Sequence, residues 1–150
     1  MTEQHEPGLL SLLTQLSKAL HRRSSEELLG MRLKPYMVLG YVRDHPGATQ
    51  QELEAGLMVD ANGVVLLLNE LEAAGHSVRR RDEHDRRRHL VELTEAGRRA
   101  LERADKAREG LENEVLATLS AEERTTLMSL ISRTLDSLKQ ATPEVAAKAR

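Results

Sequence analysis

The sequence contains no cysteine, tryptophan or phenylalanine, and two tyrosines are its only aromatic residues. The absence of cysteine excludes disulfides, thiolate metal sites and thiol-based redox sensing. With so few aromatics, the core of this 150-residue chain must be aliphatic, and its leucine-rich composition favours helices over a sandwich or barrel. No apolar run approaches the roughly 20 residues of a membrane span, and the start MTEQHEPGLL lacks the basic and apolar segments of a secretory signal. We therefore expect one cytoplasmic, mainly helical domain over residues 1–150, with no membrane partner.

Charge is unevenly distributed along the chain. The net charge is −2, yet six arginines stand against three acidic residues between positions 75 and 90, so this block carries +3 and the rest carries −5. A local basic block on an acidic body is typical of a polyanion-binding site. The alternative interpretation is a charged hairpin that water merely solvates.

Apolar residues at helical spacing predict helices in the first third of the chain. A stripe of leucines follows Pro7 at i, i+3, i+4 and i+7 spacing, and it consists of Leu9, Leu12, Leu13, Leu16 and Leu20. A second apolar stretch, residues 28–33, is interrupted by Gly30. Pro35 then opens a helix over residues 36–43, which is nearly all apolar and should be buried on most sides.

Residues 49–75 have the outline of a helix-turn-helix. The run from Thr49 to Glu52 has the form of a capping box, in which the threonine oxygen accepts from the third amide of the helix and the glutamate bonds back. Asp60 is suited to cap the next helix, which runs to Ala74 and stops at Gly75, because glycine readily adopts the left-handed conformation of helix ends. Two helices joined by a short turn that contains glycine are typical of this motif.

A β-hairpin is predicted directly after the helix-turn-helix. Residues 77–81 and 89–93 suit short strands, and the polar residues 82–85 suit the turn between them. We call this hairpin, residues 77–93, the wing. Both of its arms carry arginines.

Two long helices are expected after the wing. Thr94 suits the cap of the first, and a second capping box from Ser120 to Glu123 begins the last. The expected fold class is therefore mainly α with a small β-hairpin wing (α+β), a winged helix-turn-helix over residues 35–94. Residues 1–34 and 95–150 carry apolar stripes with little left to pack on, so we expect them to form helical dimerisation regions with a second copy.

The second helix of the helix-turn-helix has two distinct faces at 100° per residue. Its inner face carries Val64, Leu67, Leu68 and Leu71. Its opposite face carries Asn62, Leu66 and Asn69, with Gly63, Val65 and Glu70 at its margins, and Ala61 at the start of the helix is a further candidate DNA contact. Asparagine can pair bidentately with adenine and aliphatic side chains can contact thymine methyls, so this face predicts DNA reading at A·T-containing sites. The alternative is that protein covers Val65 and Leu66.

Phosphate contacts are expected from the segments before and after that helix in the sequence. Free amides at the start of the preceding helix suit an anion, and the residues there are Thr49, Gln50 and Gln51. In the wing, the candidates are Arg79, Arg81, Arg86, Arg87 and Arg88, of which Arg86 and Arg87 could enter the minor groove. Arg87 could instead form a salt bridge with Asp85 that shapes the wing.

The wing and the helix after it resemble the DxRxxxxxLTxxG signature of MarR-family transcriptional regulators. Asp85, Arg87, Leu93, Thr94 and Gly97 occupy its fixed positions. The segments Asn69–Gly75 and Thr49–Leu53 also resemble the family's "LE..G" and "T..EL" patterns. The resemblance implies a homodimer that binds a pseudo-palindromic operator in double-stranded DNA and releases it when a small phenolic or anionic effector binds.

The resemblance also implies where such an effector would lie, although the chain departs from the family pattern in the second helix of the helix-turn-helix. In the family the pocket lies where the first two helices meet the long helix after the wing, and the residues expected there are Leu13, Leu16, His21, Tyr36, Met37 and Gly40. Ordinary packing is the alternative role for Tyr36 and Met37. The chain departs from the family's usual Ser-Thr pair and basic residue at Asn62, Gly63 and Leu66, so no operator sequence is carried over.

Neither a metal site nor a catalytic site stands out in the sequence. The six histidines form no HExxH motif and no set with ligand spacing, and no nucleophile elbow, phosphate-binding glycine loop or carboxylate pair is present. We expect no enzyme activity, no cofactor and no metal. The alternatives to a DNA-binding repressor are a winged-helix module that binds a protein through Val65 and Leu66, and a metal-dependent regulator.

Overall fold

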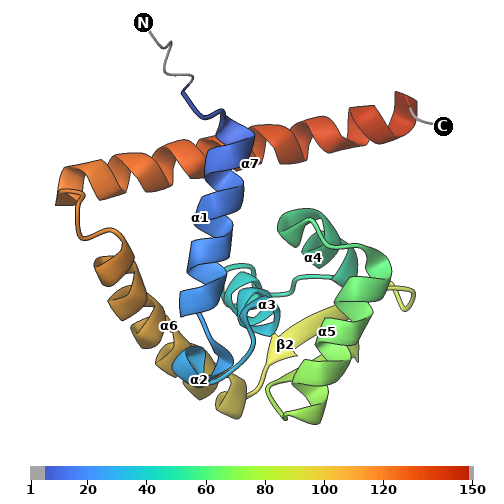
Figure 1. Ribbon diagram of the computed structural model, residues 1–150. Helices are drawn as coiled ribbons and strands as arrows, with labels where there is room; N and C mark the ends of the chain where they lie inside the picture. Colours follow the sequence, from blue (N-terminus) through green and yellow to red (C-terminus); the bar gives the residue numbers. More distant parts are fainter. Residues whose placement is uncertain (1–5, 149–150) are drawn as a thin grey trace, which may run out of the picture.

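The computed structural model describes residues 6–148, with side chains as far as residue 140. In chain order the elements are α1 (Leu9–Arg23), α2 (Glu26–Leu29), α3 (Leu33–Asp44), α4 (Gln50–Leu57), α5 (Ala61–Ala73), β1 (Ser77–Arg81), β2 (His89–Leu93), α6 (Glu95–Val115) and α7 (Ala121–Lys148). In Figure 1, α3, α4, α5 and the strands form one body, α6 runs up beside it to the start of α7, and α1 runs down toward it in front of the long α7. The prediction of a mainly helical chain with one β-hairpin is confirmed.

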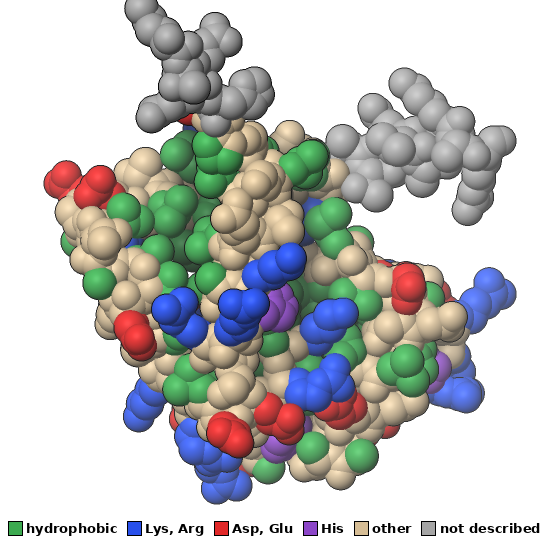
Figure 2. Space-filling model, viewed as in Figure 1, with side chains coloured by type: hydrophobic (Ala, Val, Ile, Leu, Met, Phe, Trp, Pro, Cys, Tyr) green, Lys and Arg blue, Asp and Glu red, His purple; other side chains and the backbone are tan. Residues whose placement is uncertain are grey.

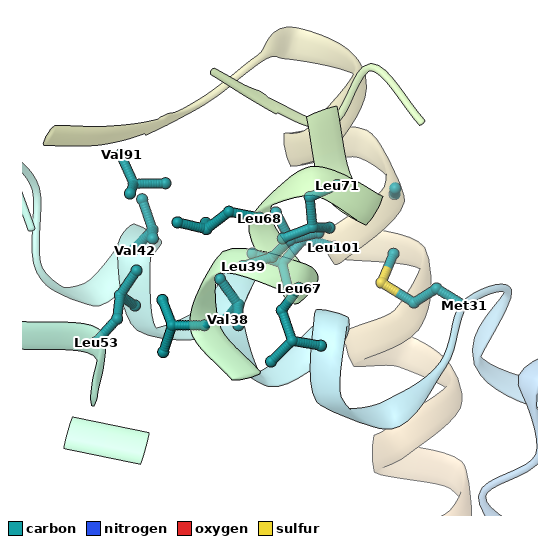
Figure 3. Close-up of a cluster of buried hydrophobic side chains, with 12 residues drawn as sticks. Met31, Val38, Leu39, Val42, Leu53, Leu67, Leu68, Leu71, Val91 and Leu101 are labelled. Atoms are coloured by element: carbon teal, nitrogen blue, oxygen red, sulfur yellow. The ribbon is translucent and has the colours of Figure 1, made fainter. Parts of the chain in front are cut away.

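The hydrophobic core lies between α3, α4, α5, β2 and the start of α6. Its fully buried side chains are Val38, Leu39, Leu53, Val64, Leu68, Val91 and Leu101, with Leu71 almost as deep. Figure 3 shows the leucines of α5 pointing toward α3 and toward Leu101 of α6. The predicted inner face of α5 is confirmed, since its four apolar residues are all buried. This packing leaves the opposite face of α5 in solvent.

Most helix ends lie where the local sequence predicts them. Thr49 and Glu52 form the complete capping box of α4, and Asp60 caps α5 by accepting from the amide of Gly63 at 2.7 Å. Helix α3 begins at Leu33, two residues before the predicted start at Pro35, because proline is tolerated in the first turn of a helix. The sequence predicted that α3 is buried on most sides, but only one side of α3 is buried.

The wing is fastened to the loop before α4. β1 and β2 pair antiparallel, with Ser77 opposite Leu93 and Arg81 opposite His89. The amide of Val91 donates to the carbonyl of Ala48 at 2.9 Å, so β2 holds the segment that leads into α4. The start of α4 is therefore held beside the wing.

Thr94 and Gly97 fix the join between the wing and α6. The Thr94 hydroxyl accepts from the Gly97 amide at 3.0 Å and donates to the carbonyl of Gly75 at 2.6 Å. A Cβ on Gly97 would lie 2.0 Å from the carbonyl oxygen of His76, so only glycine fits there. These two signature positions therefore serve the architecture rather than a ligand.

Helices α1 and α7 leave apolar side chains in solvent. Every residue of α1 is at least partly exposed, and the same holds for α7 as far as residue 140. The exposed apolar residues are Leu9, Leu10, Leu12, Leu13 and Leu16 on α1, and Met128, Leu130, Ile131, Leu135 and Leu138 on α7. Figure 2 shows hydrophobic side chains gathered in the upper part of this face, around these two helices.

Candidate nucleic-acid interface

The outer face of α5 presents amide and aliphatic side chains to solvent. Asn62 and Asn69 are exposed, Leu66 is 68% exposed and Val65 is 37% exposed. Within the residues that the structure describes, no protein segment covers Leu66, so the alternative of a face buried by this same chain does not hold. The face can offer hydrogen bonds and methyl contacts to a groove of DNA.

The two acidic residues of α5 that flank this face are each paired with an arginine. Glu70 accepts from Arg32 at 2.9 Å, and Glu72 accepts from Arg79 at 2.7 Å. The hydrogen bond from Arg79 lowers the pKa of Glu72. The pairs neutralise charge that would otherwise repel a phosphate backbone.

The start of α4 offers two backbone amides to an outside acceptor. The capping box consumes the amides of Thr49 and Glu52, at 3.2 Å and 3.1 Å from their side-chain acceptors. The first turn of a helix has four amides without helical partners, so those of Gln50 and Gln51 remain. Thr49 itself is buried, which places it in the architecture of α4, while the two glutamines lie toward solvent.

The wing presents arginines that no carboxylate neutralises. In the described part of the chain, no acidic group lies within ion-pair distance of the side chains of Arg81, Arg86, Arg87 and Arg88, and all four are exposed. Four positive charges therefore remain available to phosphates on this side of α5.

Asp85 shapes the turn of the wing through the backbone. Its carboxylate accepts from the amide of Arg87 at 3.1 Å, and its carbonyl accepts from the amide of Arg88 at 3.0 Å. The salt bridge between the side chains of Asp85 and Arg87 that the sequence suggested does not form. The Arg87 guanidinium is therefore free.

A hollow of about 200 Å³ lies between the start of α4 and the wing. It is lined by Thr49, which caps α4, by Gln50, Gln51 and Glu54 of α4, and by Arg87, Arg88 and His89 of the wing. It brings together five residues that the sequence predicted as DNA contacts from segments almost 40 positions apart. Amides on one side and guanidinium groups on the other suit a phosphate.

Arg79 differs from the other wing arginines because its side chain is already engaged. It binds Glu72 and also donates to the amide oxygen of Asn69 at 2.6 Å. Sequence reasoning counted it among the phosphate ligands, since partners on another element leave no signal in a local charge count. Its contact with DNA stays a prediction.

A polar network that sequence reasoning missed ties α6 to α3. The hydroxyl of Tyr36 donates to Asp105 at 2.6 Å and accepts from Arg108 at 3.0 Å, and Arg43 forms a salt bridge with Asp105. Burial and the bond to Asp105 raise the pKa of Tyr36 to about 12. Burial alone would raise the pKa of Asp105, but the bonds from Tyr36 and Arg43 together with the nearby arginine charges lower it. The network positions α6 on the helix-turn-helix.

The comparisons with known proteins agree with this geometry. The model of the MarR family matches residues 29–88, which run from the end of α2 to the turn of the wing. The transcriptional regulator HosA of Escherichia coli is 31% identical over 125 residues, which cover 83% of this chain and 92% of HosA. The chain belongs to the MarR family.

Two further comparisons show how far the likeness extends. A putative transcriptional regulatory protein for the hcr operon of Thauera aromatica is 35% identical over 98 residues, 65% of this chain, and the match spans little more than half of that protein, 59%. The structure of a cysteine-to-serine mutant of MarR from E. coli, complexed with operator DNA, is 28% identical with a TM-score of 0.74 and covers 85% of this chain and 93% of that one. The winged helix-turn-helix fold is thus confirmed.

The role of the six residues expected to form a MarR effector pocket stays a prediction. Leu13, Leu16 and Met37 are exposed, and the His21 ring bonds the carbonyl of Ser17 at 2.8 Å. The hydroxyl of Tyr36 is bound within the network on α6, which favours the structural role, and a Cβ on Gly40 would meet open space.

A different hollow lies where the end of α1 and α2 face α6. It measures about 470 Å³ and is lined by Arg23, Ser25, Leu28, Lys106, Ala107, Gly110, Leu111 and Glu114. None of the six expected residues lines it. Two cations over aliphatic side chains suit a small anionic compound.

Neither a metal centre nor a membrane span is found in the described residues. No group of three or more His, Asp or Glu side chains there could hold a metal ion, and His5 lies outside the described residues. No helix among them is long and apolar enough to cross a bilayer.

Proposed function

We propose that this protein is a transcriptional regulator, a dimeric repressor that binds a pseudo-palindromic operator in double-stranded DNA and leaves it when a small effector binds. One observation carries the proposal above all. The exposed face of α5 lies beside a cluster of unpaired phosphate-binding groups, which the amides at the start of α4 and the arginines of the wing form together. Because its MarR relatives regulate transcription, we propose a regulatory and not a catalytic role, exerted in the cytoplasm without a cofactor.

Different groups of the protein are proposed to contact the bases and the phosphates. α5 would lie in the major groove, which admits one helix, with Asn62, Val65, Leu66 and Asn69 toward the base edges. Gln50, Gln51 and the free wing arginines would bind the flanking backbone, which sets affinity for any sequence. The arginine-free face of α5 would favour sites that contain A·T pairs.

Dimerisation supports this proposal because one copy reads only one half-site. Soluble monomers rarely leave a large contiguous apolar surface in water, and α1 and α7 expose ten large apolar residues between them. We propose that residues 1–34 and 95–150 cover this surface with a second copy. The two copies of residues 35–94 would then read half-sites about one helical turn, roughly 34–36 Å, apart.

The effector is proposed to be a small anionic or phenolic compound held beside α6. The hollow lined by Arg23, Leu28, Lys106 and Leu111 touches α1, α2 and α6, so an occupant could shift α6 relative to the helix-turn-helix. A shift of α6 would change the distance between the two copies of α5.

The experiment that tests the proposed function is selection of bound fragments from random DNA, followed by sequencing. An enriched inverted repeat with half-sites about one helical turn apart supports the operator-binding dimer. If no fragment is enriched, the repressor hypothesis fails and a protein partner on Val65 and Leu66 becomes the better interpretation. Enrichment that a chelator abolishes would instead support the metal-dependent regulator.

A further inference from the structure

His89 lines the hollow between the start of α4 and the wing. It is the first residue of β2 and stands two positions before the fully buried Val91. Side chains two positions apart in a strand point to the same face, so the ring of His89 is directed toward α4 and not toward the outer surface of the wing. Its side chain is only half-buried, and a ligand in the hollow can therefore reach it.

Both ring nitrogens of His89 are available to a ligand. Within the part of the chain that the structure describes, the ring has no hydrogen-bond or ion-pair partner. His21 and His45 differ, because each of their rings bonds a backbone carbonyl four residues earlier, at 2.8 Å and 2.9 Å. A neutral imidazole has one N–H donor, whereas a protonated imidazole has two donors and a positive charge.

The charged groups around His89 come from the wing and from α4. Arg87, Arg88 and Glu54 line the same hollow, and Arg81 lies opposite His89 on β1. None of these four side chains has a salt-bridge partner among the described residues. With two arginines and one glutamate, the walls of the hollow carry +1 while the ring is neutral and +2 when it is protonated.

Glu54 makes the charge of His89 important to a phosphate. Its carboxylate is the one acidic group among the described residues that line the hollow, and it repels an anion there. A protonated imidazole offsets this repulsion and donates a charge-assisted hydrogen bond, which is roughly twice as strong as a neutral one. Free imidazole side chains titrate at about pH 6.5, so a moderate change of pH alters their charge.

We propose that His89 is a further phosphate contact of the DNA-binding surface, and that its protonation makes the affinity for DNA depend on pH. This inference rests on the proposed function and deepens it. Because a phosphate favours the protonated ring, DNA binding takes up protons, and the affinity rises as the pH falls. The sequence showed no role for His89, because nothing local to β2 indicates that its first residue meets α4.

The size of the effect follows from how strongly a phosphate prefers the protonated ring. A tenfold preference corresponds to about one pKa unit. For an imidazole that titrates at about pH 6.5, Kd is then about sevenfold lower at about pH 5.5 than at about pH 8 for one copy, and about fiftyfold lower for a dimer.

The test measures Kd on the selected operator by fluorescence anisotropy over this pH range, at constant ionic strength because phosphate contacts depend on salt. His89→Gln keeps a donor but cannot take a charge, so most of the pH dependence should disappear. His89→Arg carries its charge at every pH, so its Kd at about pH 8 should lie near the wild-type value at about pH 5.5. The matched control is His84→Gln, which changes an exposed histidine of the wing outside the hollow and should keep the wild-type pH dependence.

Two further measurements examine the hollow itself. Glu54→Gln removes the repulsive carboxylate, so it should lower Kd at about pH 8 by about twofold to fivefold for each copy and leave the pH dependence in place. NMR of the wild-type protein follows the ring of His89 without any substitution. The midpoint of its titration should move to higher pH, by about one unit, when operator DNA is added.

Two results would overturn the inference. One is that His89→Gln keeps the wild-type pH dependence, and the other is that DNA leaves the NMR midpoint of His89 where it was. In both cases the wild-type protein would still enrich an inverted repeat and bind it. Failure of the proposed function would show instead as no enriched fragment and no operator binding at any pH.

Discussion

Replacement of Asp105 by alanine should loosen the contact between α6 and the helix-turn-helix. Asp105 accepts from Tyr36 at 2.6 Å and pairs with Arg43, and its side chain is 21% exposed. A hydrogen bond to a charged group contributes about 1.5–3 kcal/mol. The half-exposed Arg43 adds about 0–1 kcal/mol, because water screens surface pairs.

The expected loss for Asp105→Ala is therefore about 2 kcal/mol in the free energy of unfolding, since Tyr36 also keeps a hydroxyl that has lost its acceptor. For a chain of this size that corresponds to a fall in Tm of roughly 4–8 °C. Tyr36→Phe removes the bond to Asp105 and the bond from Arg108 but leaves the pair of Asp105 with Arg43, so it should cost about 1–2 kcal/mol.

Thermal unfolding followed by circular dichroism measures these changes. All variants are compared at one protein concentration, because the stability of a dimer depends on concentration. The matched control is Glu102→Ala, which removes the same charge from an exposed position of α6. If Asp105→Ala and Glu102→Ala lower Tm equally, the network contributes nothing and the reasoning fails.

Three further predictions concern pH, the join after the wing and the apolar face. Stability should fall as pH rises from about 10 to 12, because the unfolded chain deprotonates Tyr36 first, and Tyr36→Phe should reduce this fall in urea titrations. Gly97→Ala should cost at least about 1–3 kcal/mol in the same titrations, because a Cβ meets the carbonyl of His76; an unchanged midpoint would contradict this. Ile131→Glu should yield monomers in sedimentation velocity, whereas Glu122→Gln should not.

Local signals in the sequence were enough for most of the fold. The two capping boxes begin α4 and α7 as predicted, because cap and helix start lie within four residues of one another. The wing strands also have their predicted bounds, since polar turn residues separate two short runs that suit strands. The predicted start of α3 at Pro35 was two residues too late, because proline fits the first turn of a helix as well as the position before it.

The parts of the site that sequence could not give depend on contacts between distant segments. Tyr36 and Asp105 are 69 positions apart, and no periodicity or motif links them. The pairing of Arg79 with Glu72 likewise needs β1 to pack on α5, so a count of charges made Arg79 look the same as Arg86. The outer face of α5 was predictable because it follows from the inner one.

The central claim is that the free wing arginines bind the DNA backbone beside α5, and salt dependence tests it most directly. Fluorescence anisotropy would measure Kd on the selected operator across a series of salt concentrations for wild type, Arg86→Ala and Arg103→Ala, the last an exposed arginine on α6. Loss of one phosphate contact in each of two copies should reduce the slope of log Kd against log salt by about 1.8 for Arg86→Ala. Arg103→Ala should leave the slope as in wild type. Equal slopes for all three proteins, or binding that salt does not weaken, would contradict the claim.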